Sequence, residues 1–244
     1  MVNFRLGSRA HKALTNEGPS ERLVTVEDPL GIAAESYRTL RAQLLHVLPD
    51  PPQKVIMLTS SSPGDGKSTT CANLGVTLAQ AGRSTLLMDC DLRKPTLHKV
   101  FGLRNFRGVV DALADEHDLQ AALQGPFPNL HVATTGPIPL NPSELLSSGR
   151  FAELVHQVRQ RFDFVLIDSP PVLMNSSPLG SLADPVILAM QADGAIDGVL
   201  LVLDAQSTSK GTLRRAVRTL ESAGANILGT IVNNAKVSKT GYYY

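Results

Sequence analysis

The feature that most constrains the fold is an alternation of short apolar runs with longer segments of helical periodicity. "KVIMLTS" (54–60) is almost entirely apolar, and "STTCANLGVTLAQAG" (68–82) follows it with helix-forming residues and a terminal glycine. Strand-like runs of the same kind recur at residues 84–90, 129–135, 163–169, 198–204 and 226–234. Strands this apolar must be covered on both faces, so the alternation predicts a mostly parallel sheet with helices on either side.

Three further segments have helical character. Residues 31–48 place apolar side chains at helical spacing and end before the proline-rich stretch "PDPPQ" (49–53). Residues 144–162 and 209–224 are also predicted to be helical. Together with the strands, they predict a doubly wound α/β domain whose sheet has about seven strands.

The predicted domain occupies residues 31–234, including the N-terminal helix 31–48. Residues 1–30 are polar and turn-rich and are expected to form a flexible arm. Residues 235–244 end in three tyrosines and are expected to form a flexible tail.

Composition excludes several classes of protein. The net charge is +1, and the 23 basic and 22 acidic residues are interspersed, so the chain has no overall positive electrostatic field that would favour a nucleic-acid partner. No run approaches the roughly 20 apolar residues of a membrane span, and the N-terminus lacks a signal peptide's apolar core. Cys71 and Cys90 lack the spacing of metal ligands and are interpreted as core residues of a protein in a reducing compartment. A single buried disulfide between them is the alternative. A cytoplasmic protein is expected.

A phosphate-binding loop is predicted between the first strand and its helix, in "SSSPGDGKSTT" (60–70). Glycines let the backbone fold around a phosphate, and the helix N-terminus adds positive charge. Lys67 would reach the β- and γ-phosphates of ATP, and the Ser68 hydroxyl would bind Mg²⁺. The general pattern has glycine where this chain has Ser61. The residues predicted to bind ATP here are Ser62, Pro63, Gly64, Asp65, Gly66, Lys67, Ser68 and Thr69.

Three carboxylates follow apolar strands. Asp89 and Asp91 lie in "LLMDCDLRKP" (86–95), and Asp168 lies in "VLIDSPP" (165–171). The carboxyl ends of parallel strands meet at one edge of a sheet, so these acids should gather beside the phosphate loop. Their mutual repulsion favours a divalent cation, and Mg²⁺ prefers oxygen ligands. The combination predicts cleavage or transfer of a nucleotide phosphate.

These motifs, in this order, resemble the Walker A, Walker A′ and Walker B motifs of the bacterial tyrosine kinases (BY-kinases), over roughly residues 30–244. The resemblance implies a P-loop NTPase architecture and a kinase that controls capsule or exopolysaccharide production. It implies that Lys67 is catalytic, that Asp89 is the base, and that Ser68, Asp91 and Asp168 organise Mg²⁺. Asp89 and Asp91 could exchange roles. Asn233, at the end of the last strand, is expected to contact the adenine.

Two more features fit the family. Glu35, Arg38 and Arg41 match its E-x-x-R-x-x-R oligomerisation motif, although such a run is otherwise a solvated charged face. Tyr37 on the same helix is expected to pack rather than to be a substrate. The terminal Tyr242, Tyr243 and Tyr244 resemble the family's autophosphorylation cluster, although a tyrosine tail alone could be an accident of composition. A homo-oligomeric ring is implied, in which each tail is phosphorylated in trans.

The resemblance also implies partners. Without a fused membrane segment, the chain resembles the stand-alone form, which a membrane-embedded polysaccharide co-polymerase activates and recruits to the inner face of the membrane. Other tyrosine-containing proteins are expected substrates. Two departures are Asp65, where the family more often has glutamate, and a long stretch at 172–197, which leaves the geometry beside Asp168 open.

Two other functions remain open. A partitioning or positioning ATPase of the deviant-Walker group would hydrolyse ATP, but that group carries a lysine where this chain has Ser62. A catalytically silent nucleotide-binding scaffold is the third hypothesis, and the intact set of lysine, serine and three aspartates argues against it.

Overall fold

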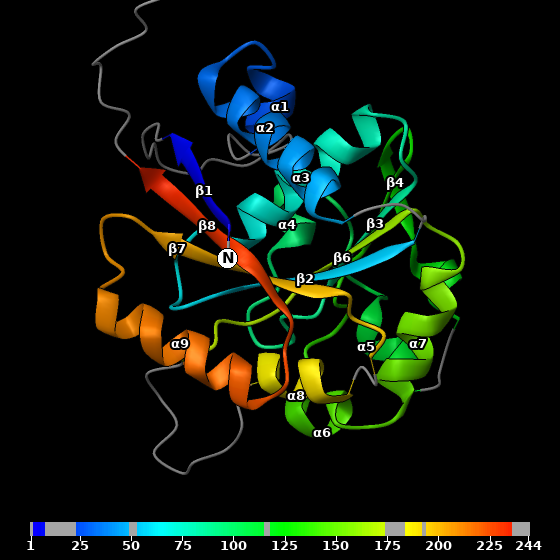
Figure 1. The fold of residues 1–244 in the computed structure, drawn as a ribbon. Coiled ribbons are helices and arrows are strands. Elements are labelled where there is room, and N and C mark those ends of the chain that lie inside the picture. Colours follow the sequence, from blue (N-terminus) through cyan, green and yellow to red (C-terminus); the bar gives the residue numbers. More distant parts are fainter. Residues whose placement is uncertain are drawn as a thin grey trace, which may run out of the picture.

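A computed structural model describes residues 2–7, 23–48, 53–114, 118–173, 184–191 and 194–235 of the chain. These residues form one sheet with helices on both faces (Figure 1). The strands are β1 (Val2–Gly7), β2 (Lys54–Ser60), β3 (Thr85–Asp89), β4 (Gln124–Phe127), β5 (Leu130–Ala133), β6 (Phe164–Asp168), β7 (Gly198–Asp204) and β8 (Ile227–Ala235). The helices are α1 (Val24–Glu27), α2 (Ile32–Val47), α3 (Lys67–Gln80), α4 (Leu97–Phe101), α5 (Val109–Leu113), η1 (Leu119–Ala122), α6 (Pro142–Leu146), α7 (Arg150–Arg159), α8 (Asp184–Gln191) and α9 (Lys210–Ser222).

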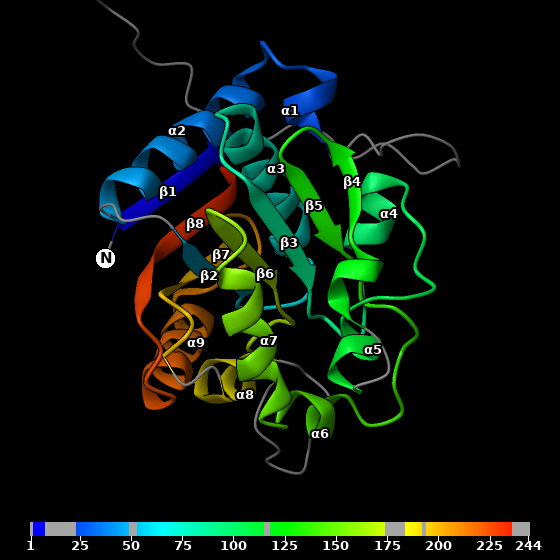
Figure 2. The same ribbon diagram turned by 90° about the vertical axis from the view of Figure 1, so that its right-hand side faces the viewer.

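The sheet has the strand order β1-β8-β7-β2-β6-β3-β5-β4, which Figure 2 shows from one edge to the other. All neighbouring strands are parallel except β4, which runs antiparallel to β5. The six runs predicted from apolar character are β2, β3, β5, β6, β7 and β8. The predicted mostly parallel α/β sheet is confirmed, and it has eight strands in the described residues because β1 and β4 add one at each edge.

The helices divide into two layers because side chains alternate along each buried strand. In β2, Val55 and Met57 join a core beneath α5, α7, α8 and α9, whereas Ile56 and Leu58 join a second core beneath α2, α3 and α4. Figure 1 shows the two layers on opposite sides of the sheet. Every residue of β3 and β6 is buried, as expected for central strands covered on both faces.

The N-terminal region differs from the expected flexible arm. Within residues 1–30, the structure places β1, which pairs in parallel with β8, and the short helix α1. Leu23, just before α1, is fully buried in the core beneath α2. The sequence around these elements is polar, and both depend on contacts with distant parts of the chain.

One other predicted segment is also corrected. The helix predicted at residues 144–162 is two helices, α6 and α7, separated at Ser147–Ser148–Gly149, where serine and glycine favour a turn. The long stretch 172–197 contains helix α8.

Cys71 and Cys90 are both buried free thiols, so the disulfide that the sequence left open is not formed. Burial raises the pKa of both thiols, as befits core residues. Among the described helices, none is at once long enough and apolar enough to cross a membrane.

Candidate active site

Strand register brings the predicted acids together. β6 lies between β2 and β3, and Asp168 at its end is paired with Leu58 on one side and with Asp89 on the other. Lys67 begins α3, directly after the loop that leaves β2. Three strand ends that are distant in the sequence therefore deliver the lysine and the acids to the same edge of the sheet.

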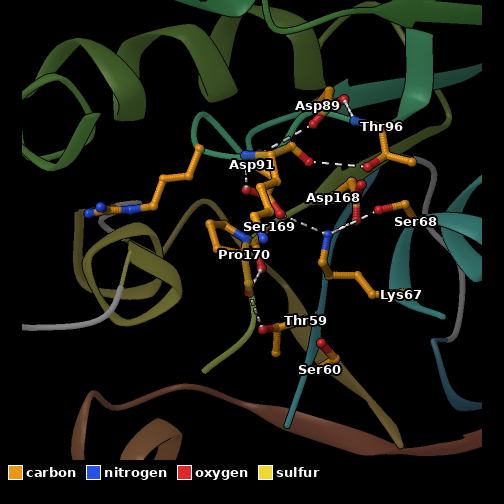
Figure 3. Close-up of polar contacts among 12 residues, drawn as sticks. Thr59, Ser60, Lys67, Ser68, Asp89, Asp91, Thr96, Asp168, Ser169 and Pro170 are labelled. Carbon is orange, nitrogen blue, oxygen red and sulfur yellow. Dashed lines mark hydrogen bonds and ion pairs between the residues drawn. The ribbon is translucent and has the colours of Figure 1, made fainter. Parts of the chain in front are cut away.

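The Lys67 ammonium lies at the centre of this group (Figure 3). Its Nζ atom is 3.0 Å from Asp168 Oδ1, 3.3 Å from Asp91 Oδ2 and 3.0 Å from the Ser68 hydroxyl. The side chains of Lys67, Asp91 and Asp168 are all less than one-tenth exposed. Lys67 is thus in direct contact with two of the three predicted acids, Asp91 and Asp168.

Charge and burial compete at this cluster. Burial by itself lowers the pKa of Lys67, but the charges of Asp168 and Asp91 outweigh burial and raise it. Burial raises the pKa of Asp168, and Lys67 opposes that rise. The lysine is therefore held as a cation that partly neutralises a buried group of carboxylates.

Asp89 is fully buried and is bound to its own loop. Its Oδ2 atom accepts hydrogen bonds from the backbone N–H groups of Thr96 and Leu97, each at 2.9 Å, and its Oδ1 atom accepts one from Asp91 N at 3.3 Å. Burial, with a contribution from the charge of Asp168, raises the pKa of Asp89 to about 7. A carboxyl group with such a pKa exchanges protons near neutral pH, which suits a proton acceptor.

Asp91 is also buried, at 5% exposed. Its Oδ1 atom accepts a hydrogen bond from Lys94 N at 3.0 Å, while its Oδ2 atom faces Lys67. One oxygen of Asp91 thus stabilises the turn toward Lys94, and the other contacts the Lys67 ammonium.

Asp65 braces the phosphate loop from within. Its Oδ2 atom accepts hydrogen bonds from the Ser61 hydroxyl at 2.7 Å and from Ser62 N at 2.9 Å. Ser61, where the general motif has glycine, thus has a role in holding the loop. Ser61 also lies 3.4 Å from the Thr208 hydroxyl, which follows β7. No local pattern pointed to Thr208, because only the fold brings it to the loop.

Asn233 is also brought to the loop. Its side-chain amide donates to Asp65 O at 3.2 Å and packs against Gly66. Gly64 and Gly66 have φ values of +91° and +89°, which favour glycine. Pro63 and Gly64 are exposed, and Ser62, Ser68 and Thr69 are partly buried, so the loop borders solvent beside the Lys67 cluster.

The donor set fits Mg²⁺. Asp168 Oδ2 is buried and has no hydrogen-bond partner, and the nearby Ser68 hydroxyl, like Lys67, opposes the rise that burial causes in the pKa of Asp168. In the part of the chain that the structure describes, no three His, Cys, Asp or Glu side chains form a metal-binding group. Asp91, Asp168 and Ser68 instead offer two carboxylates and a hydroxyl. Mg²⁺ commonly binds through one or two carboxylates and completes its shell with water and phosphate oxygens.

The three motif residues of α2 have partners within this chain. Glu35 and Arg38 form an ion pair at 2.8 Å, and Arg38 also donates to Pro29 O. Arg41 donates to Thr77 O of α3 at 2.8 Å. All three residues border a groove of about 560 Å³ along α2. Tyr37 on the same helix is buried, which raises its pKa to about 12 and confirms that it packs. The terminal tyrosines Tyr242, Tyr243 and Tyr244 lie outside the described residues.

Comparison with known proteins places this arrangement in a family. A family model described as "AAA domain" matches residues 53–218. The "Tyrosine-protein kinase YwqD" of Bacillus subtilis (strain 168) is 39% identical over 225 residues, covering 91% of this chain and 90% of the relative. The solved kinase domain of Escherichia coli tyrosine kinase ETK is 26% identical with a TM-score of 0.83, covering 99% of this chain and 93% of that one.

A third similarity concerns the nucleotide. The septum site-determining protein MinD of Pyrococcus horikoshii OT3, solved in complex with Mg-ADP, is 26% identical with a TM-score of 0.59. The similarity covers 76% of this chain and 72% of that one. The chain therefore shares its P-loop NTPase fold with a protein that binds Mg-ADP. The comparisons support the use of a nucleotide and Mg²⁺ in general. From the geometry of the site and the likeness to YwqD and ETK, the chain belongs to the bacterial tyrosine kinase (BY-kinase) family and is an enzyme of the protein-tyrosine kinase class.

Proposed function

We propose that this chain is an ATP-dependent autokinase that phosphorylates Tyr242, Tyr243 and Tyr244 of a neighbouring copy. The observation that carries the proposal is the contact of Lys67 with Ser68, Asp91 and Asp168 at the ends of neighbouring strands. Phosphoryl transfer requires a held phosphate chain, a metal site and an acceptor for the phenolic proton. This edge of the sheet offers residues for each.

The loop of residues 62–69 and the start of α3 would hold the ATP phosphates through backbone N–H groups. Lys67 would turn from the carboxylates to the β- and γ-phosphates. Ser68, Asp91 and Asp168 would hold Mg²⁺, which neutralises charge on the transferred group. Support comes from the positive φ values of Gly64 and Gly66 and from the unpaired, buried Asp168 Oδ2.

In the proposed transfer, a tyrosine oxygen forms the new bond to the γ-phosphorus, and the bond from that phosphorus to ADP breaks. The phenolic proton passes to a carboxylate. Asp89 suits this role through its pKa of about 7, but both of its oxygens already accept backbone hydrogen bonds. Asp91 has an oxygen that faces the centre of the cluster. Both remain candidates for the base, and Asn233 remains the candidate for the nucleoside side of the pocket.

We further propose that copies assemble in a ring through Glu35, Arg38 and Arg41. The groove along α2 supports this idea, because these residues border it. Each phosphate adds about −1.5 to −2 charges, so a fully modified tail would carry roughly −5 and should leave an acidic site. We place the enzyme in the cytoplasm, where a membrane-embedded polysaccharide co-polymerase would activate it. It would then control exopolysaccharide or capsule synthesis and phosphorylate other proteins on tyrosine.

The test uses radiolabelled ATP, Mg²⁺ and the cytoplasmic segment of the co-polymerase. A Lys67→Met chain that retains its tail is mixed with an active chain truncated before Tyr242. We expect phosphotyrosine on the inactive chain only when both are present. An unlabelled inactive chain beside an active full-length enzyme would exclude transfer in trans.

The same assay separates the rival functions. Release of free phosphate without labelled tyrosine would favour an ATPase of the deviant-Walker group. Neither product would favour a nucleotide-binding scaffold. The Lys67→Met chain alone is the matched control, because it keeps the tail and loses the cation that faces the phosphates.

A further inference from the structure

An ion pair between an exposed arginine and a buried aspartate lies outside the cluster described above. The Arg93 guanidinium donates two hydrogen bonds to the carboxylate of Asp184. Its Nε atom lies 2.5 Å from Oδ2, and its Nη2 atom lies 3.1 Å from Oδ1. Ser143 completes the contact, because its hydroxyl accepts from Arg93 Nη2 and donates to Asp184 Oδ1, each at 2.8 Å. Asp184 is 1% exposed, so its charge depends on these partners.

The three residues come from parts of the chain that meet beside the site. Arg93 lies in the loop between β3 and α4, two residues after Asp91. Asp184 is the first residue of α8, and Ser143 lies in α6. The ion pair therefore fastens the loop that carries Asp91 to helices on the far side of that loop.

The loop's other hydrogen bonds are internal or lead to parts of the chain other than α6 and α8. Cys90 N donates to Asp168 O of β6 at 2.8 Å, and the Thr135 hydroxyl donates to Asp89 O at 2.9 Å. Asp91 accepts from Lys94 N, and Asp89 accepts from Thr96 N and Leu97 N. These contacts set the shape of the loop, but none of them anchors it to α6 or α8. The Arg93 side chain provides that anchor, and the hydrogen bonds to Asp184 raise the pKa of Arg93, which keeps it charged.

We propose that Arg93 is a positioning residue. Its contact with Asp184 and Ser143 holds the 89–97 loop so that Asp91 Oδ2 faces Lys67 and the Mg²⁺ that would accompany a bound nucleotide. This inference rests on the proposed function for the metal site, and it assigns to residues outside the motif acids a part in metal binding. Partners that orient a metal ligand typically change metal affinity or activity by roughly 10–100-fold when they are removed.

The test substitution is Arg93→Lys, which keeps the charge but loses the two-pronged contact. Its matched control is Arg159→Lys. Arg159 pairs with Asp197 at 2.7 Å, and Asp197 also accepts from Val55 N, at the end of β2 opposite the active site. Both variants weaken a partly buried arginine–aspartate pair, but only one pair touches the loop of Asp91.

Two measurements are made on the full chain, and neither depends on catalysis. The first is the Mg²⁺ concentration that half-saturates the binding of a fluorescent ADP analogue. We expect Arg93→Lys to raise it roughly tenfold and Arg159→Lys to leave it at the wild-type value. The second is hydrogen exchange in the nucleotide-free protein, where Arg93→Lys should speed exchange at Lys94, Thr96 and Leu97 and the control should not.

Ser143→Ala provides a milder variant that removes one hydroxyl from the contact. It should shift the Mg²⁺ requirement in the same direction as Arg93→Lys, by a smaller factor. If Arg93→Lys leaves both the Mg²⁺ requirement and the loop exchange unchanged, or changes them no more than Arg159→Lys does, the positioning role is wrong. A wild-type chain that binds Mg-ADP but never labels tyrosine would refute the proposed autokinase and leave this test intact.

Discussion

At the residue scale, two glycines of the phosphate loop have the same backbone conformation and different surroundings. Gly64 and Gly66 both have φ near +90°. A Cβ atom on Gly64 would meet nothing within 4 Å, whereas one on Gly66 would lie 1.9 Å from the Asn233 side-chain nitrogen. The second position therefore requires glycine for space as well as for conformation.

These surroundings predict unequal effects of alanine. Gly64→Ala should lower the free energy of unfolding by about 1–2 kcal/mol, the cost of a left-handed alanine. Gly66→Ala should lower it further and weaken nucleotide binding, because Asn233 must move. Urea unfolding and titration with a fluorescent ADP analogue measure the two effects.

The double variant Gly66→Ala/Asn233→Ala provides the control, since it removes the collision and keeps the strained backbone. The loss in its free energy of unfolding is corrected by subtracting the loss measured for Asn233→Ala alone. The corrected loss should be close to that of Gly64→Ala. If Gly64→Ala and Gly66→Ala are equally destabilised, the close packing of Asn233 has no energetic role.

Site residues could be predicted from the sequence where they belong to a recognisable motif. Lys67, Ser68, Asp89, Asp91 and Asp168 were found from local patterns, and the fold brings them together as expected. The bracing role of Asp65 was not predictable. Its side chain bonds to Ser61 and Ser62 of its own loop, a choice that depends on the folded path of the loop.

At the element scale, α3 is the helix on which the N-terminal segment rests. Thr25 of α1 donates from its backbone N–H and its hydroxyl to Asn73 Oδ1, at 3.1 and 2.9 Å. The Asn73 side-chain amide in turn donates to Thr69 O, in the first turn of α3, at 2.9 Å. One buried asparagine thus joins α1 to the end of α3 that begins the phosphate site.

This connection predicts a stability loss for Asn73→Ala. The two Thr25 donors would lose their acceptor while remaining buried, and each such group costs about 1–3 kcal/mol. We expect a fall of a few kcal/mol in the free energy of unfolding, measured by urea denaturation. Asn226→Ala is the comparison, because the Asn226 amide donates to Asp197 O at an exposed position and should cost much less. Equal losses in the two variants would contradict the proposed joint.

Elements with a strong local pattern were predictable, and those that depend on distant partners were not. The buried runs of β2, β3, β6 and β7 and the helices α2, α3 and α9 follow from periodicity alone. β4 has the sequence "QGPF", whose glycine and proline disfavour a strand, and it exists at the sheet edge, where proline is tolerated. β1 pairs with β8 more than 200 residues further along the chain, which no local pattern could reveal.

At the scale of the whole molecule, β1 covers an edge of the sheet. It pairs in parallel with β8 over residues 2–7, and without it the N–H and C=O groups on that side of β8 would be open. Exposed strand edges promote association between molecules. The first strand is therefore predicted to protect the enzyme from aggregation.

Deletion of residues 1–7 tests this role. We expect a lower Tm, by about 2–4 °C for each kcal/mol lost in a domain of this size, and light scattering that rises with protein concentration. Deletion of residues 236–244, which removes no described strand, is the control. If the N-terminal deletion variant stays monodisperse and has the Tm of the full chain, pairing with β1 is not needed to protect the edge of β8.

The order of strands in the sheet also determines when the enzyme becomes competent during its synthesis. The strand bearing Asp168 inserts between two strands made much earlier, and β7 and β8 then flank the phosphate loop from the other side. A nascent chain that has emerged from the ribosome only through residue 97 has its lysine and its first two aspartates but lacks the partner that joins them. Because the proposed metal site also needs Asp168, we expect no phosphoryl transfer until β6 has been synthesised and has inserted between β2 and β3.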